Sequence, residues 1–187
     1  MLPFVILALL GGAYLLASSS GTAGGSGGGG GSGEHRGWTV ATAQDIFDYM
    51  KAHMTLPPGM SASDPMPPPK PEVTAQLDAL QKSVESGAKP KSPPYILKHD
   101  PSVPAMRILG VEGTVQSVSG SGAGRVWLVS FEKIVEQQSE MQPPPPELAA
   151  MGLTFPVPLP VKTKVPEPAI GSVFALGDSS FSIGMGK

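Results

Sequence analysis

The hydrophobic pattern begins with an uncharged apolar run. Residues 2–17 read LPFVILALLGGAYLLA, and the first charged side chain is Glu34. As a helix, the run spans roughly 24–28 Å, just under the thickness of a bilayer's hydrocarbon core. Its glycine pair would be costly in a soluble helix but is common in membrane helices. We therefore expect residues 1–20 to form a single-pass transmembrane anchor in contact with a lipid bilayer.

Two alternatives remain open for this run. A cleaved signal peptide would need a basic start, whereas the first Lys or Arg of the chain is Arg36. A helix buried in a soluble core fits poorly with the glycine tract that follows. Because basic residues are missing close to either end of the run, the pattern predicts no membrane orientation.

A tract made almost entirely of Gly and Ser covers residues 18–33. Such a chain behaves as a flexible coil with a root-mean-square reach of about 20–24 Å. We assign residues 21–37 to a linker that gives a downstream domain freedom relative to the membrane. An engineered linker has the same composition, so this alternative is kept.

Helical periodicity begins after residue 42. Thr42 and Asp45 have the spacing of a capping box, with Asp in place of the usual Glu or Gln. The apolar positions that follow share one helix face: Ile46, Phe47, Met50 and Met54. The pattern predicts a helix that stops before Pro57, followed by an extended proline-rich connector over residues 56–71.

A second helix is predicted between Pro71, a favourable first helical residue, and Gly87, a favourable stop. Its apolar residues are spaced four, three and four apart and form a narrow seam: Val73, Leu77, Leu80 and Val84. Such a seam packs either on the chain's own small domain or on a partner helix or second copy. We therefore include these four residues among the candidate partner-binding positions.

Strand patterns begin near Met106. Apolar residues mixed with Gly110 and Gly113 predict a bent or bulged strand that ends near residue 118. A loop, residues 119–124, leads to a second strand over residues 126–135. On that strand Trp127, Val129 and Phe131 share one face, so the pair is predicted to be a β-hairpin.

Proline interrupts the pattern after residue 142. Residues 143–146 are all proline, and prolines at 156, 158 and 160 restrict the next segment to a sheet edge or a polyproline helix. The last element, residues 172–185, is predicted to be a second hairpin around a turn at 177–180. In that hairpin, Val173 and Ala175 would lie opposite Phe181 and Ile183.

Together these elements predict an α+β chain. The expected order is a transmembrane helix, a glycine-rich linker, two short helices and a small β-rich domain, barrel- or sandwich-like, with proline-rich extended segments. We place the helical and proline-rich region at residues 38–100 and the β domain at residues 101–187. The strand pattern resembles that of an OB- or SH3-like barrel, without any family motif.

The composition limits the partners and the functional sites that the chain can have. The chain has 187 residues, with 24 Gly, 22 Pro and a net charge of −2, so no global charge draws it to nucleic acid or anionic lipid. It has no cysteine, which excludes disulfides, thiolate nucleophiles and zinc–thiolate sites.

The residue patterns predict no enzyme, no cofactor and no metal site. His35, His53 and His99 have no second His at ligand spacing, and the acidic residues form no pair fixed well enough for acid–base catalysis. Four methionines near the first helix could suit Cu(I), but an apolar helix face with adaptable contacts explains them better. They are Met50, Met54, Met60 and Met66.

The predicted hairpin also carries the residue types of a stacking platform for single-stranded nucleic acid. Trp127 and Phe131 lie among three basic residues: Arg107, Arg125 and Lys133. Core aromatics with charges at the rim are the simpler interpretation, and nucleic acid is not expected as a partner. Trp127 and Phe131 complete the candidate partner-binding positions.

From these features we predict a non-enzymatic, membrane-anchored structural protein. It would tether a small protein-binding domain within a larger assembly, either a membrane-containing virion or a bacterial envelope complex, with other proteins of that assembly or further copies of itself as partners. The alternative is a secreted or anchored OB/SH3-like module that binds an oligonucleotide or an oligosaccharide.

Overall fold

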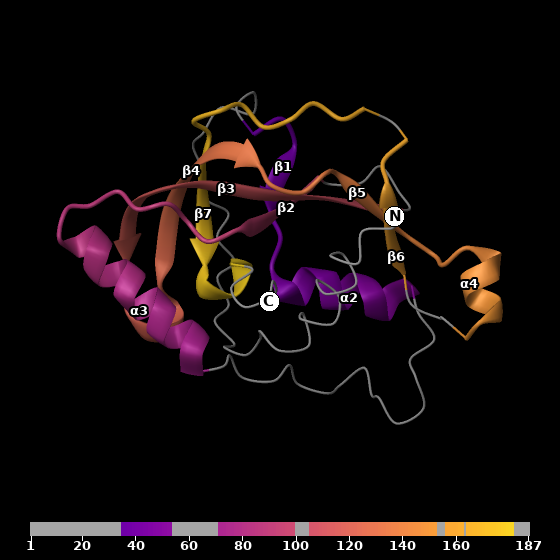
Figure 1. Ribbon diagram of the computed structural model, residues 1–187, viewed down its shortest axis with the longest axis horizontal. Coiled ribbons are helices and arrows are strands. Elements are labelled where there is room, and N and C mark those ends of the chain that lie inside the picture. The colour runs from indigo at the N-terminus through magenta and orange to yellow at the C-terminus, as the bar shows by residue number, and fades with distance from the viewer. Residues whose placement is uncertain (1–34, 54–70, 100–104, 153–155, 163, 182–187) are drawn as a thin grey trace.

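The described residues of the computed structural model are 35–53, 71–99, 105–152, 156–162 and 164–181. They form a β-rich structure in which one sheet curves into a nearly closed barrel, with a few short helices around it (Figure 1). Within these ranges no helix is both long enough and apolar enough to cross a membrane. The predicted anchor, residues 1–20, lies outside them.

Five antiparallel strands form the barrel wall in the order β1-β2-β3-β4-β7. Their bounds are Trp38–Val40 for β1, Tyr95–His99 for β2, Met106–Ser119 for β3, Val126–Ile134 for β4 and Val173–Gly177 for β7. β3 and β4 pair antiparallel, which confirms the predicted hairpin. A short 3₁₀ turn, η1 (Gly122–Gly124), lies in the loop between them.

The longest strand, β3, is bent as predicted. Its register against β4 shifts at Glu112/Gly113 and again at Val115/Ser117. At Gly113 the two strands come so close that a Cβ atom would lie 2.0 Å from the carbonyl oxygen of Ser130. Glycine is therefore required there, and the bulge lets β3 curve far enough to belong to two parts of the sheet.

A smaller lobe extends from the first half of β3. There β3 pairs with β5 (Ser139–Gln142), and β5 pairs with β6 (Val157–Pro160). Among the described residues β6 pairs with β5 alone, which confirms the edge position predicted from its prolines. Because Pro158 and Pro160 have no N–H, only Val157 and Leu159 can donate ladder bonds to β5, and the outer edge is left poor in donors.

The barrel closes between β7 and β1 without a regular ladder. The imidazole of His35, just before β1, stacks on Phe174 with ring centroids 4.4 Å apart. Its Nε2 lies 3.1 Å from the carbonyl oxygen of Val173. An isolated bridge joins Phe181 to Tyr95 of β2. The chain thus enters the barrel at the open edge of β7.

The barrel interior is filled by a core that takes side chains from every wall strand. Its largest fully buried members include Trp38, Tyr95, Trp127 and Phe181. Helix α3 (Pro71–Glu85) covers one side of this core. A segment that we call the strap, residues 164–169, crosses above the barrel in Figure 1, whereas α3 lies below.

Side chains from around β1 hold the strap. Trp38 Nε1 donates to the carbonyl oxygen of Pro166 at 2.7 Å, and Arg36 donates to that of Glu167 at 3.0 Å. Val165 adds its side chain to the core. The strap is therefore fixed by donors that reach its backbone, as well as by packing.

A second, smaller core lies between the sheet and helix α2 (Ala43–His53), where Ile46 packs against Ile96, Met106 and Met141. The predicted capping box is confirmed. The Thr42 N–H donates to Asp45 Oδ2 at 2.7 Å, and the Asp45 N–H donates to Thr42 Oγ1 at 3.1 Å. The side chains of Phe47 and Met50, and the whole of Met54, lie outside the described parts of the chain.

The partner predicted for Phe181 is wrong. The predicted turn is present as a 3₁₀ turn, η2 (Asp178–Ser180), and β7 pairs with β4. Phe181 bridges to β2, and Ile183 lies outside the described residues.

Other elements were not foreseen from the pattern. β1 and β2 lie within residues 38–100, a region expected to be helical and proline-rich, yet both belong to the sheet. β5 and the short helix α4 (Pro146–Ala150) were not predicted either. Strands this short give too few alternating positions for a period to be recognised.

Candidate interaction surface

The six candidate partner-binding residues all lie in the barrel core or against it. On α3, Val73 and Leu77 are buried members of the core, and Leu80 and Val84 pack against it. The seam therefore contacts the chain's own barrel, as in the first of the two alternatives. Trp127 and Phe131 of β4 are 0% and 2% exposed, and a partner could reach them only if the core opened.

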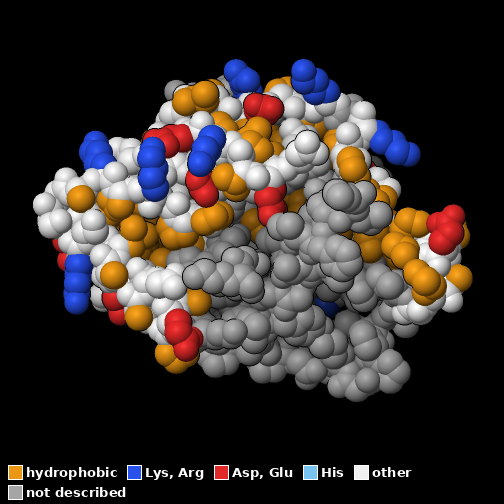
Figure 2. Space-filling view, in the orientation of Figure 1, with side chains coloured by type: hydrophobic (Ala, Val, Ile, Leu, Met, Phe, Trp, Pro, Cys, Tyr) orange, Lys and Arg blue, Asp and Glu red, His pale blue; other side chains and the backbone are white. Residues whose placement is uncertain are grey.

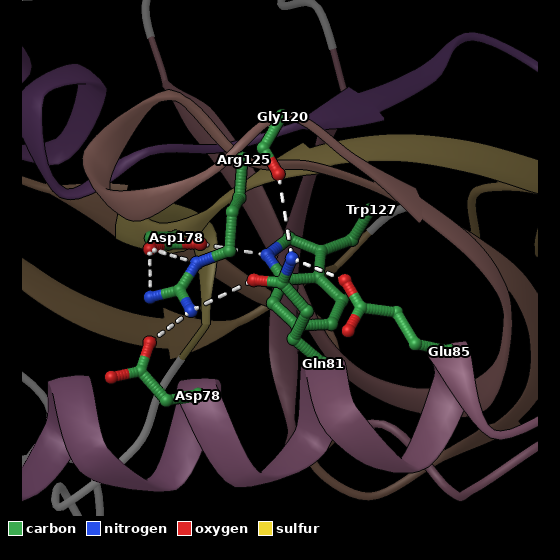
Figure 3. A network of polar contacts seen from close by, with 7 residues as sticks. All are labelled: Asp78, Gln81, Glu85, Gly120, Arg125, Trp127 and Asp178. Atoms are coloured by element: carbon green, nitrogen blue, oxygen red, sulfur yellow. Dashed lines mark hydrogen bonds and ion pairs between the residues drawn. The ribbon is translucent and has the colours of Figure 1, made fainter.

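An ionic network begins beside these core residues and links three separate segments (Figure 3). Arg125, just before β4, has a side chain only 1% exposed. Its guanidinium donates to Asp78 of α3 at 2.5 Å and to Asp178 of η2 at 3.0 Å. The Trp127 indole N–H also donates to Asp178, at 2.7 Å. We call this group the Arg125 clasp.

The charge balance of the clasp explains how a guanidinium can be buried. Burial alone would lower the pKa of Arg125, but the hydrogen bonds and charges of Asp178 and Asp78 outweigh it and raise the pKa above its usual value. The two carboxylates differ, because the Asp78 side chain is 53% exposed and that of Asp178 only 19%. The clasp therefore fixes α3 and η2 to the start of β4, with Asp178 as its inner partner.

The opposite face of β4 is apolar and open to solvent. Val126 and Leu128 are each 40% exposed, and Val173 of the neighbouring β7 is 42% exposed. The alternation of β4 explains this, since Trp127, Val129 and Phe131 point into the core and the residues between them point out. We call this surface the outer face: positions 126, 128 and 130 of β4 with their cross-strand neighbours on β3 and β7.

The outer face has a regular relief. Val126 lies between Ser119 on β3 and Gly177 on β7, and Leu128 lies between Ser117 and Ala175. The two large side chains of β4 thus form a ridge. The trough beside it on β7 consists of Ala175 and Gly177 and ends at the large side chain of Val173, opposite Ser130. None of these positions carries an ionisable side chain.

The face shown in Figure 2 has a different character. In the view of Figure 2, Lys and Arg side chains are spread apart and interleaved with Asp and Glu, without a continuous basic area. Lys91, for example, pairs with Glu132, which also accepts from Thr114. These hydrogen bonds lower the pKa of Glu132. Such a surface does not resemble the basic groove that tracks a nucleic-acid backbone.

No group of three or more His, Asp or Glu side chains in the described ranges is placed to hold a metal ion. His35 bridges the barrel edge, and His99 stacks edge-on against Trp38 with centroids 5.2 Å apart. The side chains of His53 and of Met50, and the whole of Met54, Met60 and Met66, lie outside the described parts of the chain.

Sequence reasoning missed the outer face because it asked only which residues of β4 point inward. A signal was present: residues 126–129 read VWLV, so apolar side chains occupy both faces of the strand. That pattern predicts a strand covered on both sides. The described structure covers only one of them.

No protein-family model, curated protein or solved structure matches the chain. The function is therefore argued from the surface and the organisation of the chain.

Proposed function

We propose that the protein is a non-enzymatic, membrane-anchored structural protein whose barrel docks within a larger assembly. Residues 1–20 anchor the chain, residues 21–37 tether the barrel, and the outer face makes the contact. The setting is a membrane-containing virion or a bacterial envelope complex. The observation that carries the proposal is the uncharged, solvent-open outer face on a barrel whose interior is already filled.

The exposure of the outer face supports docking for an energetic reason. Burial of apolar surface stabilises a contact by roughly 25 cal/mol per Å², so each ridge side chain that a partner covers adds to the affinity of the contact. The ridge residues are held by a rigid strand whose inner side is anchored in the core. A partner that covers Val126 and Leu128 therefore gains apolar burial at little cost in ordering the chain.

The point where the tether enters supports the same interpretation. His35 contacts Val173 and Phe174 of β7, so the linker joins the barrel beside the outer face. The tether holds this part of the barrel close to whatever the anchor is embedded in. The alternative function, a ligand-binding module that uses Trp127 and Phe131, is less favoured, because both aromatic side chains are committed to the core.

The anchor is tested on the full chain from its native source. We expect it to resist extraction with alkaline carbonate and to have an intact mass that includes residues 2–17. Release by carbonate, or a chain that begins near residue 18 or 24, would contradict the anchor. The docking part is tested in the native assembly with Leu128→Lys. We expect this variant to be lost from the sedimenting assembly, whereas Val135→Lys, at a position equally exposed outside the outer face, is retained.

A further inference from the structure

We infer that the outer face binds a second copy of this chain, with the β4 ridge of each copy seated in the β7 trough of the other. The inference rests on the proposed function, because it names the partner of the same face. In this contact Leu128 of one copy lies over Ala175 of its partner, and the reverse contact occurs across a two-fold axis.

Shape is the first argument. Every cross-strand pair on the outer side of β4 and β7 joins one large apolar residue to one small residue: Val126 with Gly177, Leu128 with Ala175, and Val173 with Ser130. Sheets that pack face to face interdigitate when large and small residues alternate in this way. A copy rotated by 180° presents a ridge where the first presents a trough, so the relief fits itself.

Charge is the second argument. In a two-fold contact each surface meets an identical surface, so any charge near the axis faces its own like charge. The outer face itself has no ionisable side chain. The ion pairs begin at its border, where Lys91 and Glu132 contact Thr114, the cross-strand neighbour of Ser130, and Lys133–Glu112 lies farther along the β3–β4 pair. The part of the sheet free of charge is also the part with the ridge and troughs.

Size explains why the contact needs the anchor. The face spans about five residues along β4, roughly 16 Å, and three strands across, roughly 10 Å. The area of the face is therefore well below the roughly 800 Å² that each partner buries in a stable complex. Copies held on one membrane are concentrated near one another, and a weak contact suffices when the effective concentration is high.

Cross-linking tests the geometry directly because the chain has no cysteine of its own. Full chains carrying Leu128→Cys and Ala175→Cys are mixed, reconstituted into phosphatidylcholine vesicles and oxidised, and disulfides are identified by peptide mass spectrometry. We expect a 128–175 disulfide as the dominant product. Ala150→Cys on α4, equally accessible in the described structure, serves as the control and is expected to give only background cross-linking.

Energy transfer tests the strength of the contact. Copies labelled through Ser86→Cys, an exposed position at the end of α3, are compared in vesicles with and without Leu128→Lys. We expect Leu128→Lys to weaken association about tenfold or more, since the buried lysine would be left without a partner. Val135→Lys should leave the transfer unchanged.

Three results would overturn the inference. One is background cross-linking at 128–175, and another is unchanged transfer in Leu128→Lys. The third needs vesicles that also contain a lipid labelled on its headgroup with an acceptor dye. If Leu128→Lys reduces energy transfer to this lipid but leaves transfer between copies unchanged, the outer face rests on lipid. Carbonate extraction of the same vesicles tests the anchor separately. If the chain is released, cross-linking of the released protein at millimolar concentration still decides whether the copies meet through this face.

Discussion

The inner and outer faces of the β4 region carry opposite chemistry within a few residues. The inner side holds a buried cation, Arg125, and beside it the indole of Trp127, both bound to Asp178. The outer side shows Val126 and Leu128 to solvent. One cation is thus buried beside the apolar core, while apolar side chains on the other side of the same strand are exposed.

The contrast separates two kinds of stabilisation. The hydrogen bonds of the inner face are made within one chain. The Arg125 guanidinium donates to Asp78, Asp178 and the side-chain oxygen of Gln81, and the Trp127 indole donates to Asp178. On the outer face, about 40% of the surface of Val126 and of Leu128 stays exposed, and this apolar area is available for a partner. Substitutions on the inner face should therefore change the free energy of unfolding, and those on the outer face should change association.

The largest effect is expected for Arg125→Ala. Removal of the guanidinium leaves Asp178 partly buried without its cation, which typically costs about 3–5 kcal/mol of unfolding free energy. The change is measured by urea unfolding of the full chain in detergent, with the fluorescence of the buried Trp38 and Trp127 as the signal. Lys133→Ala, which breaks an exposed ion pair, should cost less than about 1 kcal/mol. Equal costs for the two variants would contradict the clasp.

The two carboxylates of the clasp should differ. Asp178→Asn weakens hydrogen bonds to both Arg125 and Trp127 in a mostly buried place, so we expect a loss of about 2–3 kcal/mol. Asp78→Asn acts at a half-exposed side chain and should cost about 1 kcal/mol or less. The same urea titrations give both unfolding free energies. A larger loss for Asp78→Asn would mean that Asp78 of α3, and not Asp178 of η2, is the main partner of Arg125.

Neighbouring positions on β4 provide the most direct comparison of the faces. Val129→Ala opens a cavity in the filled core and should cost about 2 kcal/mol. Leu128→Ala removes a side chain from the outer face and should cost below about 1 kcal/mol in the monomer. If both variants lose the same stability, the outer face is already buried and the contrast fails.

A last, small effect concerns the ionic contact between Asp45 of α2 and Lys98 of the wall strand β2. Burial alone would raise the pKa of Asp45, but hydrogen bonds from Lys98 and Thr42 outweigh it and hold the pKa below 3.8. The folded chain therefore binds this proton less tightly than the unfolded chain. The stabilisation is present above about pH 4 and is lost as the pH falls through the lowered folded value.

Unfolding free energies of the wild type and of Asp45→Asn, measured from pH 7 to pH 2.5, test this. We expect the two curves to differ by about 1 kcal/mol at neutral pH and to converge in acid. Curves that stay parallel down to pH 2.5 would show that Asp45 contributes no proton-linked stability.

What the sequence by itself determined is local. The capping box at Thr42, the helix from Pro71 and the bulged hairpin were all readable, because each depends on partners a few residues away or on a short period. The three-strand row β3–β4–β7 was not, because the pairing of β7 with β4 joins residues far apart in the sequence, which no short period connects.

Only the tertiary structure decided which side of each element became the inside. The seam of α3 was visible as a pattern, but either the barrel or a partner could have covered it, and the barrel did. Arg125 finds its acceptors 47 and 53 residues away, a separation across which no periodicity connects them. The outer face has the same origin. A strand with apolar residues on both sides can bury either side, and α3 and the strap pack around the barrel core, so that Val126 and Leu128 lie outside it.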